Sequence, residues 1–255
     1  MKVHHLNCGT MNSPVARWVC HVLLVESPVG LVLVDSGYGL ADIAAPAERL
    51  GFVRRVVRPV LDPAETAIRQ VERLGFAADD VRHVVLTHLD LDHIGGLADF
   101  PWAEVHVSAA EGAAMHAPTF QDRVRYRPVQ WAHEPRVVEH ATDGELWHGF
   151  PAAREIVTPG LVYVAMPGHT RGHAAVAVEA DDGWLLHAGD AFFHHGRIDG
   201  TPVPRALRIH EQVVAVVPRK MKANQARLAE LHRDPDAGVR IFCAHDPAQF
   251  ESVAG

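Results

Sequence analysis

Apolar residues gather in short runs along the chain, separated by segments rich in Gly, Pro and Asp. Residues 22–25 and 31–34 form two such runs, and the segment Glu26 to Gly30 between them has the composition of a turn. A β-hairpin is therefore predicted here. Runs of the same kind predict further strands at 81–86, 105–107, 161–165, 174–178, 184–186 and 239–242.

Helices are predicted where capping residues precede apolar positions at helical spacing. Asp62, Pro63 and Glu65 predict a capped start, apolar residues follow at 67, 68, 71 and 74, and Gly75 predicts the end. A second helix is predicted from Pro218 to about residue 232, and Ser108 with Glu111 predicts the cap of a third. Strands and helices mix throughout, which favours an α/β sandwich with mixed sheets over an all-parallel sheet.

The 255 residues show no internal repeat and no low-complexity linker, so one domain spanning 1–255 is expected. Hydrophobic residues make up 48% of the chain and charged residues 22%, as in ordinary globular proteins. A formal net charge of −7 argues against nucleic acid and anionic membranes as partners. The first residues lack the apolar core of a signal peptide, and no apolar run could span a bilayer. We therefore expect a cytoplasmic protein, with a homodimer left open.

Several of the apolar runs end close to a side chain that can bind or support a metal ion. The chain holds 19 histidines, and what matters is which of them the fold brings together. Strand ends at one edge of a sheet converge, and a rigid sheet can hold a site to close tolerance. The residues that follow such runs are Asp35, His88, His169, Asp190 and His245.

The segment after the run at 81–86 is dense in potential ligands. His88, Asp90, Asp92 and His93 fall within six positions, and Gly95 and Gly96 follow them. Glycines let the backbone pass close to such a cluster, and a turn into a helix at this point would let Asp92 and His93 face the same side. Four potential ligands exceed what one ion needs from one loop, so two metal ions that share ligands are predicted.

These residues resemble the signature of the metallo-β-lactamase superfamily, in which His-x-His-x-Asp-His precedes a distant His, a bridging Asp and a last His. The resemblance covers nearly the whole chain. It implies a four-layered αβ/βα sandwich of two mixed β-sheets flanked by helices, and a metal-dependent hydrolase acting on a small molecule. It matches the metal ligands to His88, Asp92, His93, His169, Asp190 and His245, and a supporting carboxylate to Asp35 in Val-Asp-Ser-Gly.

One position departs from the signature, because Asp90 stands where the second His is expected. Carried over, site one would hold His88, Asp90, His169 and the bridging Asp190, and site two would hold Asp92, His93, Asp190 and His245. A carboxylate is a harder ligand than imidazole and moves preference toward Mn or Fe. Two divalent ions are expected, with zinc the first choice and Mn or Fe as alternatives because of Asp90.

A hydroxide that bridges two ions would be the nucleophile, and Asp92 or Asp190 would be the catalytic carboxylate that passes a proton to the leaving oxygen. Asp35 or Asp246 is expected to support the ligand histidines from behind, and His173 is expected to act in the same indirect way. His194 or His195, shortly after Asp190, is a candidate for contact with the substrate.

The segment at about 111–150 is rich in aromatic residues with arginines interleaved, which predicts a lid or insert over the site, with core packing or a dimer face as the alternative. Lactone or carboxylic-ester hydrolysis, as in acyl-homoserine lactonases, is the expected activity. A glyoxalase-II-like thioesterase is one alternative. Another is a diiron redox protein or a non-hydrolytic metal-binding or ligand-sensing member of the same fold.

Overall fold

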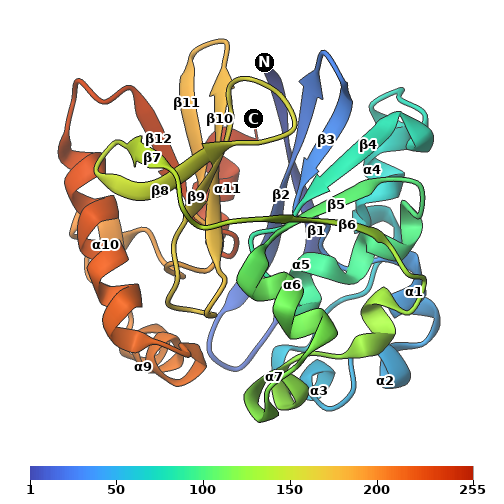
Figure 1. Cartoon of the computed structure of the whole chain (residues 1–255). Helices are drawn as coiled ribbons and strands as arrows, with labels where there is room; N and C mark the ends of the chain where they lie inside the picture. Colours follow the sequence, from blue (N-terminus) through green and yellow to red (C-terminus); the bar gives the residue numbers. More distant parts are fainter. Residues whose placement is uncertain (255) are drawn as a thin grey trace.

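The computed structural model describes residues 1–254, and twelve strands in this range form two sheets (Figure 1). The first sheet has the order β1-β2-β3-β4-β5-β6. Its first three strands pair antiparallel, whereas β3 to β6 pair parallel. Its strands are β1 (Lys2–Asn12), β2 (Arg17–Ser27), β3 (Gly30–Val34), β4 (Val81–Val85), β5 (Glu104–Ser108) and β6 (Arg136–His140).

The second sheet has the order β12-β11-β10-β9-β8-β7. Only β11 and β12 pair parallel, and the other neighbours pair antiparallel. Both sheets are therefore mixed. The strands are β7 (Glu145–Trp147), β8 (Phe150–Glu155), β9 (Leu161–Ala165), β10 (Ala174–Ala180), β11 (Gly183–His187) and β12 (Val239–Phe242).

Helices cover the outer faces of both sheets (Figure 1). The α-helices are α1 (Leu40–Ala44), α2 (Pro46–Arg49), α3 (Val53–Val57), α4 (Ala67–Arg73), α5 (Leu91–Ile94), α6 (Ala109–His116), α7 (Phe120–Arg125), α8 (Gly196–Asp199), α9 (Arg205–Val214), α10 (Pro218–Arg233) and α11 (Pro247–Val253). Short 3-10 turns lie at Pro63–Glu65, Ala78–Asp80, Gly95–Asp99 and Pro128–Trp131. No helix among residues 1–254 is both long and apolar enough to cross a membrane.

Three hydrophobic clusters separate the four layers. Between the sheets, Val32 and Val34 of β3 pack in one cluster with Tyr163 of β9 and Val176 of β10. A second cluster joins the outer face of the first sheet to α4 and α6, and a third joins the outer face of the second sheet to α8 and α10. This arrangement confirms the predicted sandwich, because each sheet buries one face against its partner and the other against helices.

The hairpin, the strands from 81 onward and the helix at Pro218 form as predicted, but the start of α4 differs. Asp62 caps a 3-10 turn, by accepting from Ala64 N at 2.9 Å, and α4 begins only at Ala67. The Glu65 carboxylate accepts instead from the backbone N and hydroxyl of Thr10, both at 2.7 Å. The predicted capping box is wrong because Glu65, its acidic residue, binds Thr10 of β1 and not the start of the helix.

The segment 111–150, predicted as a lid or insert, divides between several structures. Its first part continues α6 and forms α7, which lies at the end of the molecule where α3 and α9 also lie (Figure 1). Its last part supplies edge strands, β6 to the first sheet and β7 to the second. Phe150 is fully buried in the core, whereas Phe120 on α7 is 81% exposed. Within this range, α7 is therefore the helix that is placed to cover a site.

Candidate metal centre

The loop after β4 turns directly into α5, and this turn arranges the dense ligand segment. Asp90 has extended backbone angles at the N-cap of α5, and its carbonyl accepts from His93 N at 3.0 Å. Asp92 and His93 therefore lie in the first turn of a helix, as the sequence predicts. A Cβ on Gly95 would lie 2.8 Å from the carbonyl oxygen of Gly37, so glycine permits the close approach of α5 to the loop after β3.

One group of four donors gathers around His88. The ligand atoms of His88, Asp90, His169 and Asp190 lie within 4.8 Å of one another. Asp90 Oδ2 is 3.2 Å from His88 Nε2 and 2.9 Å from His169 Nε2, and Asp190 Oδ2 is 3.2 Å from His169 Nε2. These four residues are the set predicted for site one, and the fold brings them together from the ends of β4, β9 and β11.

A second group lies on the other side of Asp190. Asp190 Oδ1 is 3.3 Å from His93 Nε2 and 3.1 Å from His245 Nε2. Asp92 Oδ2 lies 3.4 Å from His245 Nε2 and 4.0 Å from His93 Nε2. These four residues are the set predicted for site two. Asp190 thus gives one oxygen to each group, as a bridging carboxylate would.

The donors of site two fit a metal ion. His93 Nε2 and Asp190 Oδ1 are buried and have no hydrogen-bond partner among the described residues. A buried polar atom without a partner costs free energy, and electron pairs that converge on one point suit a divalent cation. The distances of 3.1 to 4.0 Å between the donor atoms are those expected around an ion at about 2.1 Å from each ligand.

Neighbouring groups fix the orientation of the ligand rings from behind. Asp35 Oδ2 lies 2.8 Å from His93 Nδ1, while Asp35 Oδ1 accepts from Thr87 N at 2.8 Å. His173 Nε2 accepts from Asp190 N at 2.9 Å. His245 Nδ1 lies 2.7 Å from the carbonyl oxygen of Val19. Asp35 and His173 thus take the indirect positions expected of them, and the acceptor for His245 is a backbone group that no sequence pattern marks.

The pKa values of the histidines shift in opposite directions in the two groups. Burial alone would lower the pKa of His93 and of His245, but the carboxylate of Asp190 raises both above the ordinary value. Burial, followed by the charge of Arg125, lowers the pKa of His169 to about 3. His169 is therefore a neutral imidazole at neutral pH, with an electron pair to offer.

Sequence reasoning missed two charged residues that hold these loops. Glu111 was expected only as part of a helix cap, yet its carboxylate accepts from Leu89 N at 3.2 Å, Thr170 Oγ1 at 2.5 Å and Gly172 N at 3.2 Å. Arg125 binds Asp90 through two nitrogens. The interleaved arginines of 111–150 were a visible signal, but which of them reaches the site depends on the position of α7.

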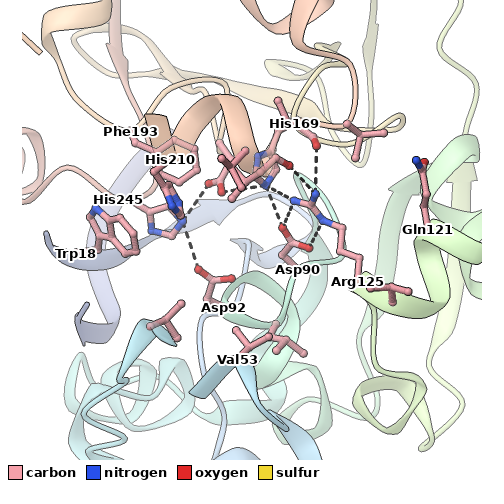
Figure 2. A pocket seen from close by; sticks show the side chains of 18 of the residues that line it. Trp18, Val53, Asp90, Asp92, Gln121, Arg125, His169, Phe193, His210 and His245 are labelled. Carbon is pink, nitrogen blue, oxygen red and sulfur yellow. Dashed lines mark hydrogen bonds and ion pairs between the residues drawn. The ribbon is translucent and has the colours of Figure 1, made fainter. Parts of the chain in front are cut away.

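A cavity of about 550 Å³ opens above both groups. Asp90, Asp92, His169 and His245 lie at its floor, and Arg125 and His210 reach into it from α7 and α9 (Figure 2). Asp190 also lines this cavity. Its walls are largely apolar and are built from Trp18, Tyr38, Val53, Val57, Leu91, Phe120, Val124, Phe193, Val213 and Val214.

The structure does not bring His194 or His195 to this cavity. His194 Nδ1 accepts from Gly196 N at 3.0 Å, and His195 Nδ1 lies 2.6 Å from Asp246 Oδ2. The chain turns into α8 directly after these residues, and neither of them lines the cavity floor. Asp246 also caps α11 by accepting from Ala248 N, so it supports His195 and not a ligand histidine.

Comparison with known sequences agrees with this geometry. Residues 15–245 match the model of the metallo-β-lactamase superfamily. The chain belongs to this superfamily. A probable metallo-hydrolase of Mycobacterium tuberculosis is 54% identical over 98% of the chain and 82% of its own length. An N-acyl homoserine lactonase of Rhizobium johnstonii is 34% identical over 98% of the chain and 90% of its own length. The chain is thus a metallo-hydrolase of the superfamily, as the motif predicts.

Solved structures show the same fold. A variant of a Bacillus thuringiensis protein with N-decanoyl-L-homoserine bound at its active site superimposes with a TM-score of 0.74, covering 98% of this chain and 95% of that one at 22% identity. A dizinc quorum-quenching lactonase superimposes with a TM-score of 0.61 over 91% of this chain and 74% of that one. At 22% and 17% identity this likeness establishes the fold.

Proposed function

We propose that the protein hydrolyses a lactone or carboxylic ester that carries an apolar tail, with two divalent metal ions held by the two donor groups. The observation that carries the proposal is that both groups share Asp190 at the floor of an apolar cavity. Such pockets, with apolar walls and a few convergent polar groups, bind small molecules that have one reactive end. The ligands would be His88, Asp90, Asp92, His93, His169, Asp190 and His245.

When bound, two such ions supply a hydroxide nucleophile at neutral pH and polarise the substrate carbonyl. Zinc is the proposed metal, with Mn or Fe as alternatives because Asp90 adds a hard oxygen ligand. Residues of the chain position the two donor groups relative to each other. Asp190 keeps both groups in register, and His173 fixes Asp190 through its backbone N.

Asp92 is the carboxylate that can move a proton. Its side chain is 20% exposed and faces the cavity, whereas that of Asp190 is almost fully buried. A carboxylate at the cavity floor can pass a proton to the oxygen that leaves when the ester bond breaks. We therefore assign this role to Asp92, and we assign to Asp190 the role of holding the reacting groups.

The lactonase relatives support the choice of substrate class. One curated relative is an N-acyl homoserine lactonase, and a solved neighbour holds N-decanoyl-L-homoserine at its active site. In this chain, Phe120 and Val124 of α7 face the cavity together with Val213 of α9. Apolar side chains at the mouth favour an acyl tail over a charged one.

The test is a screen of the purified protein, loaded with zinc, manganese or iron, on lactones, aryl esters, thioesters and phosphodiesters. Asp190→Ala serves as the blank. Asp79→Ala is the matched control, because Asp79 is an exposed acid in the 3-10 turn before β4 and is in neither donor group. We expect turnover of lactones or esters with the wild type and Asp79→Ala, and none with Asp190→Ala. Turnover of thioesters alone would replace the proposed substrate class. Activity that persists in Asp190→Ala would contradict the two-metal site.

A further inference from the structure

Arg125 places a positive charge inside the first group of metal donors. Its Nε donates to Asp90 Oδ1 at 2.6 Å, and its Nη2 binds Asp90 Oδ2. The same Nη2 lies 2.6 Å from His169 Nε2 (Figure 2). Asp90 Oδ2 and His169 Nε2 are two of the four donor atoms of site one, so the guanidinium lies beside the point that they share.

The rest of the protein holds Arg125 in this position. Its Nη1 donates to the carbonyl oxygen of Val214 at 2.8 Å and lies 3.4 Å from that of His169. Its side chain is 21% exposed although it comes from α7 at the mouth of the cavity. A guanidinium keeps its charge at any pH at which proteins stay folded. Arg125 is therefore a fixed cation with acceptors on both sides, and not a mobile surface residue.

A metal ion in site one would conflict with this arrangement. The single electron pair of His169 Nε2 cannot accept from an N–H group and bind a metal at the same time. A divalent ion beside a guanidinium also meets repulsion between like charges in a partly buried place. Asp90 has oxygens to share, but the position of Nη2 between Asp90 and His169 is the place where their electron pairs meet.

Site two shows no such competitor. No Lys or Arg nitrogen lies within 4.0 Å of the Asp92 or Asp190 carboxylates among the described residues. Its donors His93 Nε2 and Asp190 Oδ1 are left without partners, as described above. The two groups therefore differ in kind, since one is engaged by a side chain of the same molecule and the other is open.

We propose that Arg125 is an internal cation that competes with the metal ion for site one. Site two then binds its ion tightly, and site one binds a second ion weakly, only when Arg125 releases Asp90 and His169. The Asp90–Arg125 pair thus takes the place of the second histidine of the signature. This inference rests on the proposed two-metal site, but it concerns how firmly each ion is held and not which substrate is cleaved.

The experiment is a zinc titration of the metal-free protein against a chromophoric chelator, at one fixed pH and ionic strength. For the wild type we expect one tight equivalent and a second that is at least tenfold weaker. Arg125→Met should strengthen the second equivalent by tenfold or more and leave the first unchanged. Arg123→Met is the matched control, because Arg123 lies on the same helix and is exposed, and its guanidinium donates to the carbonyl oxygen of Pro118, away from the metal donors. It should behave as the wild type.

Two further variants assign the equivalents to their sites. His245→Ala should lose the tight equivalent, whereas His88→Ala should keep it. If Arg125→Met proves insoluble, Arg125→Gln supplies the same neutral comparison, since its amide can still donate to a carbonyl. Two equally tight equivalents in the wild type, or an unchanged second equivalent in both neutral variants, would overturn the inference and leave the proposed function standing. Failure of the wild type and of every variant to bind zinc, manganese or iron would overturn both.

Discussion

Asp35 Oδ2 lies 2.8 Å from His93 Nδ1, on the side of the imidazole opposite the nitrogen that faces Asp190. Asp35 follows β3 with a φ of 60°. Residues other than Gly, Asn and Asp seldom adopt this left-handed backbone conformation. Its other oxygen accepts from Thr87 N, the residue before the motif. One acid in a left-handed conformation at the end of β3 therefore orients the His93 ring and the loop that carries it.

The first prediction is that Asp35→Asn weakens metal binding at site two without unfolding the protein. Asn tolerates a positive φ and keeps the shape of the side chain, but it removes the charge that supports His93. We expect a loss of about 10- to 100-fold in zinc affinity at site two, as for other groups that support metal ligands. Zinc titration measures it, and Asp79→Asn should leave the affinity unchanged. An unaltered affinity in Asp35→Asn would show that backbone geometry alone orients His93.

The candidate metal-binding residues could be grouped from the sequence because the apolar runs before them end at one edge of the sandwich. His169 and His245 are far apart in sequence, yet both could be placed from local patterns alone. The resemblance to the family signature then assigned these residues to one or the other expected metal site. The strands at 174–178 and 239–242 were predictable for the same reason, since buried β-strands are read from continuous apolar residues.

Other features depend on contacts that no local pattern encodes. The strand β1 went unpredicted because its polar residues pair with distant partners, such as His4 with Glu26 at 2.7 Å. Glu65 binds Thr10 and does not cap the predicted helix. Arg125 binds Asp90 because α7, which carries it, lies beside the cavity. In each case the sequence shows a charged residue, and the partner that determines its role comes from the tertiary structure.

A second prediction concerns Glu111, whose carboxylate joins the motif loop at Leu89 to the loop that follows His169. Glu111→Ala would leave buried donors on Thr170 and Gly172 without an acceptor. We expect the free energy of unfolding to fall by about 2–4 kcal/mol, the usual range when a buried charged partner is removed. Urea denaturation followed by circular dichroism measures it. Glu145→Ala, an exposed acid on β7, should change stability little, and an equal loss in both variants would contradict this role.

A third prediction is that His106 makes the fold less stable in mild acid. His106 lies between His83 and His140, at 3.0 and 2.9 Å. Burial, followed by the charges of His140 and His83, lowers its pKa to about 3. The unfolded chain therefore binds the proton more readily than the folded one. The stabilising contribution of the neutral ring is complete above about pH 6.5 and is lost as the pH falls toward about 3.

At about pH 5 this difference corresponds to about 2 kcal/mol of stability relative to neutral pH. His106→Gln removes the titrating ring while it keeps hydrogen-bonding atoms, so the fall in stability between about pH 7 and pH 5 should become smaller. Urea denaturation across this pH range measures the slope. His232→Gln, an exposed histidine near the end of α10, is the control. Identical slopes for the wild type and His106→Gln would show that other groups dominate acid unfolding.

The last prediction concerns the apolar mouth of the cavity and rests on the proposed lactone substrate. Phe120 and Val213 line the cavity and are 81% and 77% exposed. Their exposed side chains can therefore pack against the acyl tail of a bound substrate. Burying each methylene of a tail contributes about 0.8 kcal/mol. We therefore expect kcat/KM to rise from butanoyl to decanoyl lactones in the wild type. The double variant Phe120→Ala, Val213→Ala should flatten this rise, mainly through KM, and leave the butanoyl substrate almost unaffected.

Leu146→Ala removes an equally exposed side chain that does not line the cavity and should keep the rise. A rise of the same size in the double variant would place the tail outside this mouth.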